Sequence, residues 1–415
     1  MGFISKVGSA GLLVSTALSA QAQTTVLTVA SFKDLDRSVM AAIPLYKKAR
    51  PDVEIKLVSL GFGDHHNAMT TALATGANLP DVMGIEIGYV AKMAEGGGVE
   101  DLSKAPYDAG ALRPKFFKFA SGQATSRGGI FAAVPADIGP GALFYRKDLM
   151  DKAGITEAQL TQSWDSYIEA GKTLKAKTGA YIVPNAATIK DIILRSGLKD
   201  GEGIYFDDKG KVLVDTPRFV RAFETAKKAR AAGIDAKVGA WSNEWSEGFK
   251  RGTVASEMMG AWLAGHLKNW IAPETAGQWR SASLPGGVAA SWGGSFYAIP
   301  KAAKNKAAAW DFIKFMTTNK DVQIAAFREL DAFPALIEAT NDPFVDQPMP
   351  FLGGQVARKQ WKATAAAIPA TAVDRLDPVA AEVVAAEFDK VLEQDKPVAT
   401  ALADAKKAIE RRVRR

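Results

Sequence analysis

Residues 25–60 read TVLTVASFKDLDRSVMAAIPLYKKARPDVEIKLVSL, and their pattern decides the fold class. The short apolar run at 26–30 is typical of a buried strand, and the alternation of apolar and polar residues at 53–60 predicts a second strand. Between them, residues 35–50 place apolar side chains on one stripe of a helix, although Pro44 should kink it. That stripe consists of Val39, Met40, Ile43 and Tyr46.

The same alternation of elements continues to residue 87. Residues 64–75 predict a helix that ends at Gly76, and the apolar run at 81–87 predicts a third strand. The order strand, helix, strand, helix, strand is typical of a parallel α/β unit. Ligands of such sheets bind at the carboxyl ends of the strands, which here are residues 31–34, 61–65 and 86–89.

A second α/β region follows and indicates a second lobe. Its first predicted strand is 142–146, and Ser163 is a suitable N-cap for a helix over 164–175. Because 415 residues exceed what one hydrophobic core usually serves, two lobes are expected. The other predicted strands are 254–259 and 296–299, and the other predicted helices are 219–232, 246–250, 307–316 and the alanine-rich tail 378–412.

Composition and missing motifs argue against several functions. The chain has no cysteine, so disulfides and a thiol nucleophile are excluded. The net charge is +7, and its Lys and Arg residues are dispersed apart from the arginines at 411–415. They accompany no DNA- or RNA-binding motif, so no nucleic-acid partner is expected. No G-x-S-x-G, H-E-x-x-H, Walker A or post-strand G-x-G-x-x-G motif indicates an enzyme, although counting carboxylates does not exclude a glycosidase pair.

Five groups of short motifs resemble, in order, the extracellular solute-binding proteins of ABC importers, specifically the sugar-binding family 1 typified by maltose-binding protein. They cover nearly the whole chain after residue 22, and their shared order carries the resemblance. The groups are LPDVM at 79–83 with GGVEDL at 97–102; GIFAAVP at 129–135 with GALFYRKDL at 141–149; AGI at 153–155 with SWD at 163–165 and KTLKAKTG at 172–179; FKRGTVA at 249–255 with MGAW at 259–262; and WGG at 292–294 with AIPK at 298–301, KNK at 304–306 and AWDF at 309–312.

This resemblance implies an α/β, two-lobed periplasmic binding protein of type II-like architecture. Each lobe would be a sheet flanked by helices, and the lobes would be joined by a hinge that the chain crosses more than once. The expected crossings lie near residues 137–141, between 284 and 293, and near 331–333. The expected domains are a signal peptide at 1–22, an N-terminal lobe of 23–138 and 290–332, and a C-terminal lobe of 139–289 and 333–415.

Candidate ligand-binding residues lie at strand ends and at the expected hinge. Sugar sites combine aromatic faces with carboxylates, amides and basic groups. The family places a Gly-x-Trp at the end of a C-lobe strand, which makes Trp262 the first candidate and Trp292 the second. A capping or surface role remains an equal rival for the acidic candidates. The full set is Phe32, Asp34, Asp64, His65, Glu86, Tyr89, Asp137, Gly139, Trp262, Trp292, Gly293, Gly294, Phe351 and Gln355.

The adjacent His65 and His66 invite a metal-binding interpretation, which their spacing disfavours. Neighbouring residues on a helix point in different directions, and the third histidine, His266, is distant in sequence. We expect no metal and no cofactor. His65 is expected either to bond a ligand hydroxyl in the cleft or to lie on the surface at a helix N-terminus.

The leading functional hypothesis is a periplasmic binding protein that delivers a mono- or oligosaccharide to inner-membrane ABC permease subunits. It would act as a monomer, and closure of the lobes would trap the ligand. One alternative is a binding protein for another polar solute, either a glycerophosphodiester or a polyamine. The other is an exported carbohydrate-active hydrolase, which would release new reducing ends from an oligosaccharide.

The first 22 residues have the order of a secretory signal peptide. Lys6 is their only charge, an apolar run extends over 7–20, and Ala20 and Ala22 form an A-x-A cleavage site. The apolar run is too short to cross a bilayer comfortably. The protein is therefore expected in the periplasm.

We predict that signal peptidase cleaves after Ala22, because Ala20 and Ala22 supply the small residues that the enzyme needs. Intact-mass spectrometry of the exported protein should then show an N-terminus at Gln23. Retention of Met1 in the exported protein would remove the basis for the periplasmic assignment.

Overall fold

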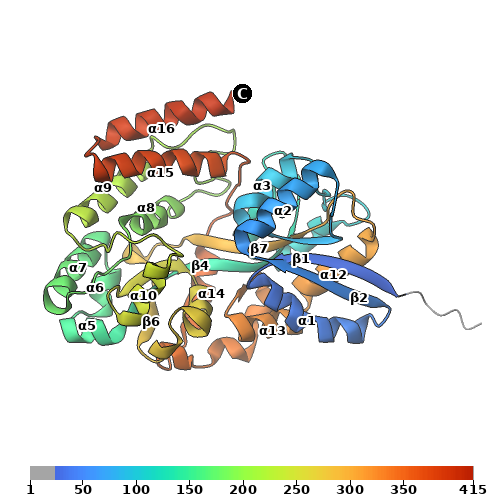
Figure 1. The fold of residues 1–415 in the computed structure, drawn as a ribbon, viewed down its shortest axis with the longest axis horizontal. Helices are drawn as coiled ribbons and strands as arrows, with labels where there is room; N and C mark the ends of the chain where they lie inside the picture. The colour runs from blue at the N-terminus through green and yellow to red at the C-terminus, as the bar shows by residue number, and fades with distance from the viewer. Residues whose placement is uncertain (1–23, 415) are drawn as a thin grey trace, which may run out of the picture.

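The computed structural model describes residues 24–414, so the predicted signal peptide lies outside the described residues. Two α/β halves lie side by side, and strands β4 and β7 run through the middle of the molecule between them (Figure 1). The strand order is β2-β1-β3-β7-β4-β5, with β6 and β8 also paired to β4. None of the helices within residues 24–414 has the length and hydropathy needed to cross a bilayer.

The first half contains the α/β unit predicted from residues 25–87, and that prediction is confirmed. Strand β1 pairs in parallel with both β2 and β3, and Leu27 and Val29 are fully buried. The elements of this half are β1 Thr25–Phe32, α1 Leu35–Ala49, β2 Val53–Leu60, α2 Phe62–Thr75, β3 Val82–Glu86, α3 Ile87–Glu95, α4 Lys118–Gln123, α12 Lys306–Thr318, α13 Lys320–Leu330 and β8 Phe333–Pro334.

Helix α1 differs from its prediction at two positions, Pro44 and Met40. It continues through Pro44, which is exposed. Val39, Ala42 and Tyr46 face the core, but Met40 is 49% exposed, so its place on the predicted apolar stripe was wrong. Met40 follows Val39 by one residue, a turn of about 100° around the helix axis, and therefore points away from the sheet.

Two strands carry the chain between the halves. The first part of β4 (Val134–Arg146) pairs antiparallel with β7 (Ser291–Ala298), and its last residues pair with β5 (Ser256–Gly260) and β6 (Trp279–Ala282). The sequence predicted strands here only over 142–146 and 296–299, because the glycines and prolines of 137–141 and 284–293 indicated hinge crossings. The ladder tolerates them through irregularities between Ile138 and Pro140.

The second half is largely helical around the short strands β5 and β6. Ser163 caps α7 as predicted, since its Oγ accepts a hydrogen bond from Ser166 N at 3.0 Å. The predicted tail helix is instead two helices, α15 and α16, which break where Asp395 adopts a φ of 52° and pack along α9 (Figure 1). The helices of this half are α5 Lys147–Ala153, α6 Glu157–Thr161, α7 Trp164–Thr178, α8 Ala186–Arg195, α9 Pro217–Ala231, α10 Asn243–Arg251, α11 Leu263–His266, α14 Ala357–Ala367, α15 Asp377–Glu393 and α16 Val398–Val413.

Buried Asp331 connects the end of α13 to the second half. Its carboxylate lies 2.7 Å from Arg358 on α14 and 2.9 Å from Lys268, which follows α11. The Asp331 side chain is 1% exposed, so both ion pairs act in a largely water-free setting. This cluster fixes the third segment that joins the halves.

A buried carboxyl group lies in the core of the second half. Glu257 on β5 accepts hydrogen bonds from Trp245 Nε1 at 2.8 Å and from Met258 N at 2.9 Å. Burial raises the pKa of Glu257 to about 7 from an ordinary 4.5, although these hydrogen bonds act to lower it. The folded state therefore holds the proton more tightly than the unfolded chain, and this contribution to stability is lost as the pH rises through about 7.

We predict that Glu257→Gln removes this pH dependence. Between pH 5 and pH 8, the free energy of unfolding of the variant should gain on the unaltered protein by roughly 2–3 kcal/mol, because each pKa unit corresponds to about 1.4 kcal/mol. Urea denaturation at both pH values measures this difference. The control is Glu247→Gln, a half-buried position on α10 that pairs with Lys250 and Arg251 of the same helix. An identical difference at both pH values would contradict the prediction.

Candidate functional site

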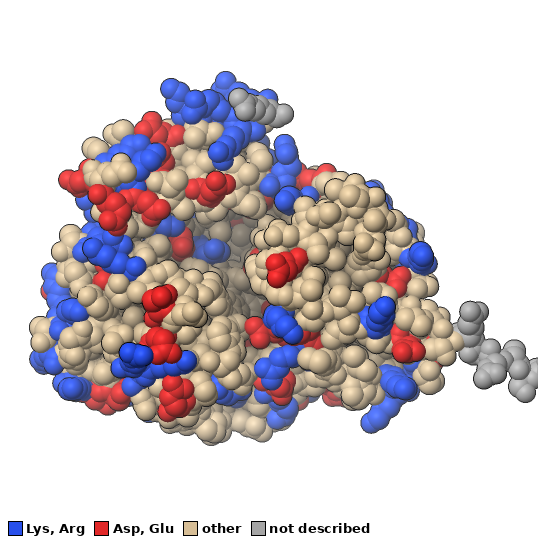
Figure 2. Space-filling view, viewed as in Figure 1, with Lys and Arg blue, Asp and Glu red and all other residues tan. Residues whose placement is uncertain are grey.

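A cavity of about 610 Å³ lies where the two halves meet, and Figure 2 shows the surface hollowed between them. It opens at the carboxyl ends of β1 and β3 and borders both crossing strands, which is where open α/β sheets place ligands. The lining residues are Phe32, Lys33, Asp34, Leu35, Ser38, Phe62, Glu86, Asp137, Trp241, Trp262, His266, Trp270, Trp292, Gly293, Gly294, Ser295, Leu330 and Ala332.

The cavity brings together eight of the residues predicted from the sequence. They come from both halves and from both crossing strands, so segments far apart in the chain meet at one place. These eight are Phe32, Asp34, Glu86, Asp137, Trp262, Trp292, Gly293 and Gly294.

Three carboxyl groups face the cavity from the first half, those of Asp34, Glu86 and Asp137, and burial raises the pKa of the last two. Glu86 ends β3 and accepts a hydrogen bond from Gly88 N at 2.7 Å, so it also caps α3. Burial raises the pKa of Glu86 to about 7, and burial raises the pKa of Asp137 to about 6 despite hydrogen bonds from Ser295. Near neutral pH both groups can therefore exchange between the ionised form, which only accepts, and the protonated form, which also donates.

Aromatic rings form the opposite wall, which we call the tryptophan wall and define as Trp241, Trp262 and Trp270. Trp241 lies nearly parallel to Trp262, with ring centroids 5.9 Å apart, and to Trp270, with centroids 6.5 Å apart. Trp241 and Trp270 are 53% and 47% exposed. His266 packs against all three rings. The wall thus offers broad apolar faces to a ligand.

Trp262 is fixed by a hydrogen bond to the crossing strand. Its Nε1 donates to the carbonyl oxygen of Trp292 at 2.8 Å. A Cβ atom at Gly139 would lie 1.8 Å from that oxygen, and one at Gly260 would lie 2.5 Å from it. Gly139 was predicted to bind ligand, but it does not line the cavity; its lack of a side chain lets the strands and Trp262 approach each other.

Trp292 stands at the floor of the cavity beside the crossing. The Arg195 guanidinium lies 4.5 Å from the centroid of its ring, a cation–π contact that holds the indole in place. Gly293 follows with a φ of 75°, a left-handed conformation that favours glycine. Gly293 and Gly294, both predicted from the sequence, therefore line the floor of the cavity through their backbone, whose conformation favours glycine.

Three predicted residues lie on or beside α2 and α3, outside the cavity. His65 is 1% exposed and its Nε2 lies 2.8 Å from Gly84 O, so the structure gives it a buried structural contact. Tyr89 stacks on His66 with centroids 4.0 Å apart. Asp64 is exposed in the first turn of α2. Among residues 24–414, no cluster of three His, Cys, Asp or Glu side chains could hold a metal ion.

The predicted residues of the 350–355 segment also lie away from the cavity. Gln355 accepts a hydrogen bond from Ser281 N at 2.8 Å and donates one to Ser281 O at 2.7 Å. Its side-chain amide thus pairs with both backbone groups of Ser281 on β6, as a neighbouring strand would. Phe351 is 6% exposed. Both residues therefore stabilise the packing of the second half and do not line the cavity.

Sequence reasoning missed several lining residues, chiefly Trp241, His266 and Trp270. The density of tryptophans between 241 and 292 was a signal for the wall, but it did not select among them. Trp241 has a φ of 69°, and Trp270 lies in a π-helical turn over Leu267–Ile271. Neither conformation follows from apolar periodicity.

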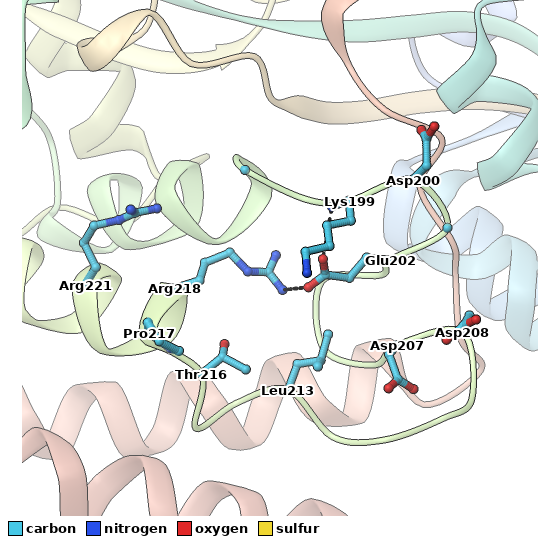
Figure 3. A pocket seen from close by; sticks show the side chains of 12 residues that line it. Lys199, Asp200, Glu202, Asp207, Asp208, Leu213, Thr216, Pro217, Arg218 and Arg221 are labelled. Atoms are coloured by element: carbon cyan, nitrogen blue, oxygen red, sulfur yellow. Dashed lines mark hydrogen bonds and ion pairs between the residues drawn. The ribbon is translucent and has the colours of Figure 1, made fainter.

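A second hollow, of about 550 Å³, lies on the surface of the second half (Figure 3). The loop between α8 and α9 and the first turns of α9 line it with charged side chains, of which Glu202 of the loop and Arg218 of α9 pair at 3.1 Å. Arg218 also donates to Leu194 O at 2.7 Å, so it holds the loop. No aromatic side chain lines this hollow, so the first cavity, which combines tryptophan faces with polar groups, is the candidate site.

Comparison with known proteins agrees with this geometry. The lactose-binding protein of Rhizobium radiobacter is 27% identical over 339 residues, 78% of each chain. The arabinooligosaccharide-binding protein of Halalkalibacterium halodurans is 25% identical over 185 residues, which span 44% of this chain but only 40% of that protein. The ABC transporter associated binding protein of B. animalis subsp. lactis Bl-04, solved with β-1,6-galactobiose, is 25% identical, with a TM-score of 0.75 over 93% of this chain and 97% of that one.

These likenesses confirm the two-lobed fold predicted from the sequence. The family described as "Bacterial extracellular solute-binding protein" matches residues 30–323, which contain all the elements that line the cavity except Leu330 and Ala332. The chain belongs to the bacterial extracellular solute-binding protein family.

Proposed function

We propose that the protein is the periplasmic binding component of an ABC importer and takes a mono- or oligosaccharide into the cavity between its halves. The observation that carries the proposal is the tryptophan wall facing the carboxyl groups of Glu86 and Asp137 across one cavity. Indole faces pack on the apolar faces of sugar rings, while carboxyl groups bond the hydroxyls. The names of the relatives, which bind lactose and arabino-oligosaccharides, support a sugar.

The charges of the cavity favour a sugar over the other polar solutes considered. Lys33 and His266 are the only basic residues among the described lining residues, and each lies beside a carboxylate. A phosphodiester would need free cationic groups or a free helix N-terminus, but the N-termini of α1 and α3 at this cavity each carry an acidic N-cap residue, Asp34 and Glu86. A polyamine would need several carboxylates that stay ionised, but burial raises the pKa of Glu86 to about 7 and that of Asp137 to about 6, so of the three lining carboxyl groups Asp34 alone has a lowered pKa.

We further propose that the protein is a monomer that binds without chemical change to its ligand and hands it to inner-membrane permease subunits. Its N-terminal lobe would comprise 23–138 and 290–332, and its C-terminal lobe 139–289 and 333–415. Strands β4 and β7 pass from one lobe to the other beside the cavity, where the Gly and Pro residues at 139–141 permit bending. Ligand would bind one lobe first and gain contacts from the other on closure.

A sugar panel tests this function, and we predict stabilisation together with compaction. Lactose, β-1,6-galactobiose, arabino-oligosaccharides, spermidine and glycerophosphocholine serve as probes in a thermal-shift assay. A sugar at 100 times its dissociation constant should add about 2.7 kcal/mol of stability. X-ray scattering with the same sugar should show a smaller radius of gyration. Stabilisation by spermidine or glycerophosphocholine alone would refute the sugar assignment, and new reducing ends would indicate a hydrolase.

The tryptophan wall yields a mutational prediction. Trp262→Ala should weaken binding of the sugar identified in the panel by about 2 kcal/mol or more, because it removes a stacking face at the centre of the site. Its unfolding free energy should fall by less than the roughly 3–5 kcal/mol expected when a core tryptophan site is emptied, because Trp262 is only partly buried. Calorimetry and urea denaturation measure the two effects.

The matched control is Trp164→Ala. Trp164 is also partly buried, and it packs edge-on against Tyr167 on α7, outside the cavity lining. This variant should lose stability without losing affinity. Unchanged affinity in Trp262→Ala, with a large loss of stability, would assign Trp262 to the core.

A further inference from the structure

Two lining residues from opposite halves touch each other across the cavity. Asp34 follows β1 in the first half, and His266 ends α11 in the second half. Asp34 Oδ2 lies 3.3 Å from His266 Nε2. The two strands that precede these residues, β1 and β5, lie far apart in the sheet order, so this contact spans the cavity.

The backbone turns the Asp34 side chain toward His266. Asp34 has a φ of 78° and a ψ of −51°, a conformation that is strained for a residue other than glycine. It occupies the N-cap position of α1, where aspartate usually bonds a backbone N–H, but its side chain makes no such bond. The Asp34 carboxylate therefore does not cap α1 and is free to contact His266.

His266 is held firmly on the opposite side. Its ring centroid lies 5.1 Å from that of Trp262, 5.6 Å from that of Trp270 and 5.9 Å from that of Trp241. The preceding Gly265 approaches Leu330 so closely that a Cβ atom there would lie 1.8 Å from its carbonyl oxygen. The His266 side chain is 18% exposed, so the contact with Asp34 is partly shielded from water.

Several other charges surround the pair. Lys33 lies beside Asp34 and pairs with Asp36 at 3.4 Å, Arg37 pairs with Glu329, and Lys268 is engaged by Asp331. Asp137 and Glu86 face the same cavity from β4 and β3. Burial acts to raise the pKa of Asp34, but the hydrogen bond from His266 and the charges of His266, Arg37 and Lys33 hold it below its usual range. Asp34 therefore stays ionised across the range in which histidines titrate.

We propose that Asp34 and His266 form a pH-dependent latch, which holds the two lobes together when His266 is protonated. The proposal rests on the lobe motion of the proposed function. A charged imidazole is attracted to the Asp34 carboxylate only while the lobes are close, so proton binding and closure favour each other. Closure of the unliganded protein strengthens as the pH falls from 8 to 5.5. A partly exposed ion pair of this kind changes the ratio of closed to open molecules about five-fold.

Distances between dye-labelled lobes in single, unliganded molecules test the latch. Because the chain contains no cysteine, Lys48→Cys on α1 and Lys152→Cys on α5, both at exposed positions, introduce unique attachment points. The closed-to-open ratio should be about five-fold higher at pH 5.5 than at pH 8. Asp34→Asn and His266→Gln should each remove most of this response. Circular dichroism checks the folding of both variants, and Asp34→Asn decides if His266→Gln does not fold.

The matched control is Asp52→Asn, which removes one carboxylate of the first half that pairs with Arg50 outside the cavity lining. It should keep the full pH response. Glu86 and Asp137 also titrate within this pH range, because burial raises their pKa values to about 7 and about 6. A pH response of the unaltered protein alone therefore does not identify the latch, whereas its loss in Asp34→Asn and His266→Gln does.

The outcomes separate the latch from the proposed function. A pH response that persists in Asp34→Asn overturns the latch, as does a single lobe distance at every pH. If the response disappears in both variants but no sugar binds, the latch stands and the sugar assignment fails. If sugars bind and close the lobes but no pH response is seen, the sugar assignment stands and the latch fails.

Discussion

The hydrogen bond from Trp262 Nε1 to the carbonyl oxygen of Trp292 is the contact on which the site depends. It joins the tryptophan wall to the strand that connects the two halves, so the wall keeps its position relative to the floor of the cavity. The bond exists only because Gly139 and Gly260 leave room for it, since a side chain at either position would collide with the bonded atoms. Three distant parts of the sequence are thereby committed to small residues or to an indole.

The fold of the first half follows from its sequence because each element there matches one simple period. Alternating and continuous apolar runs predicted β1, β2 and β3, and the helices between them were placed to within a few residues. The long strand β4 was shortened in the prediction, because Gly139 and Pro140 normally interrupt strands. Here β7 on one side supplies the pairing that holds them in an extended conformation, and no local pattern reports a partner that lies at 291–298.

The residues of the candidate site also fall into two groups, those that a local sequence pattern predicted and those that depend on distant contacts. Residues at strand ends were found wherever the strand points directly at the cavity, as for Phe32, Asp34 and Glu86. The rule failed for His65, which faces inward and bonds Gly84 once α2 has begun. Trp241 and Trp270 were missed because a left-handed residue and a π-helical turn present them, and apolar periodicity predicts neither conformation. Periodicity therefore identified the edge of the sheet, whereas tertiary contacts selected the side chains that use it.

The position of β7 in the sheet has a consequence for how the chain folds. It lies between β3 and β4, yet it is made of residues 291–298, long after both of its neighbours have been synthesised. Until that segment arrives, the first half has two unpaired strand edges and an incomplete core. Contacts between such distant segments make folding slow. The first half therefore cannot complete its core until most of the chain has been synthesised, and the chain stays unfolded for longer. An unfolded chain is the form that a protein-translocating channel in a membrane accepts.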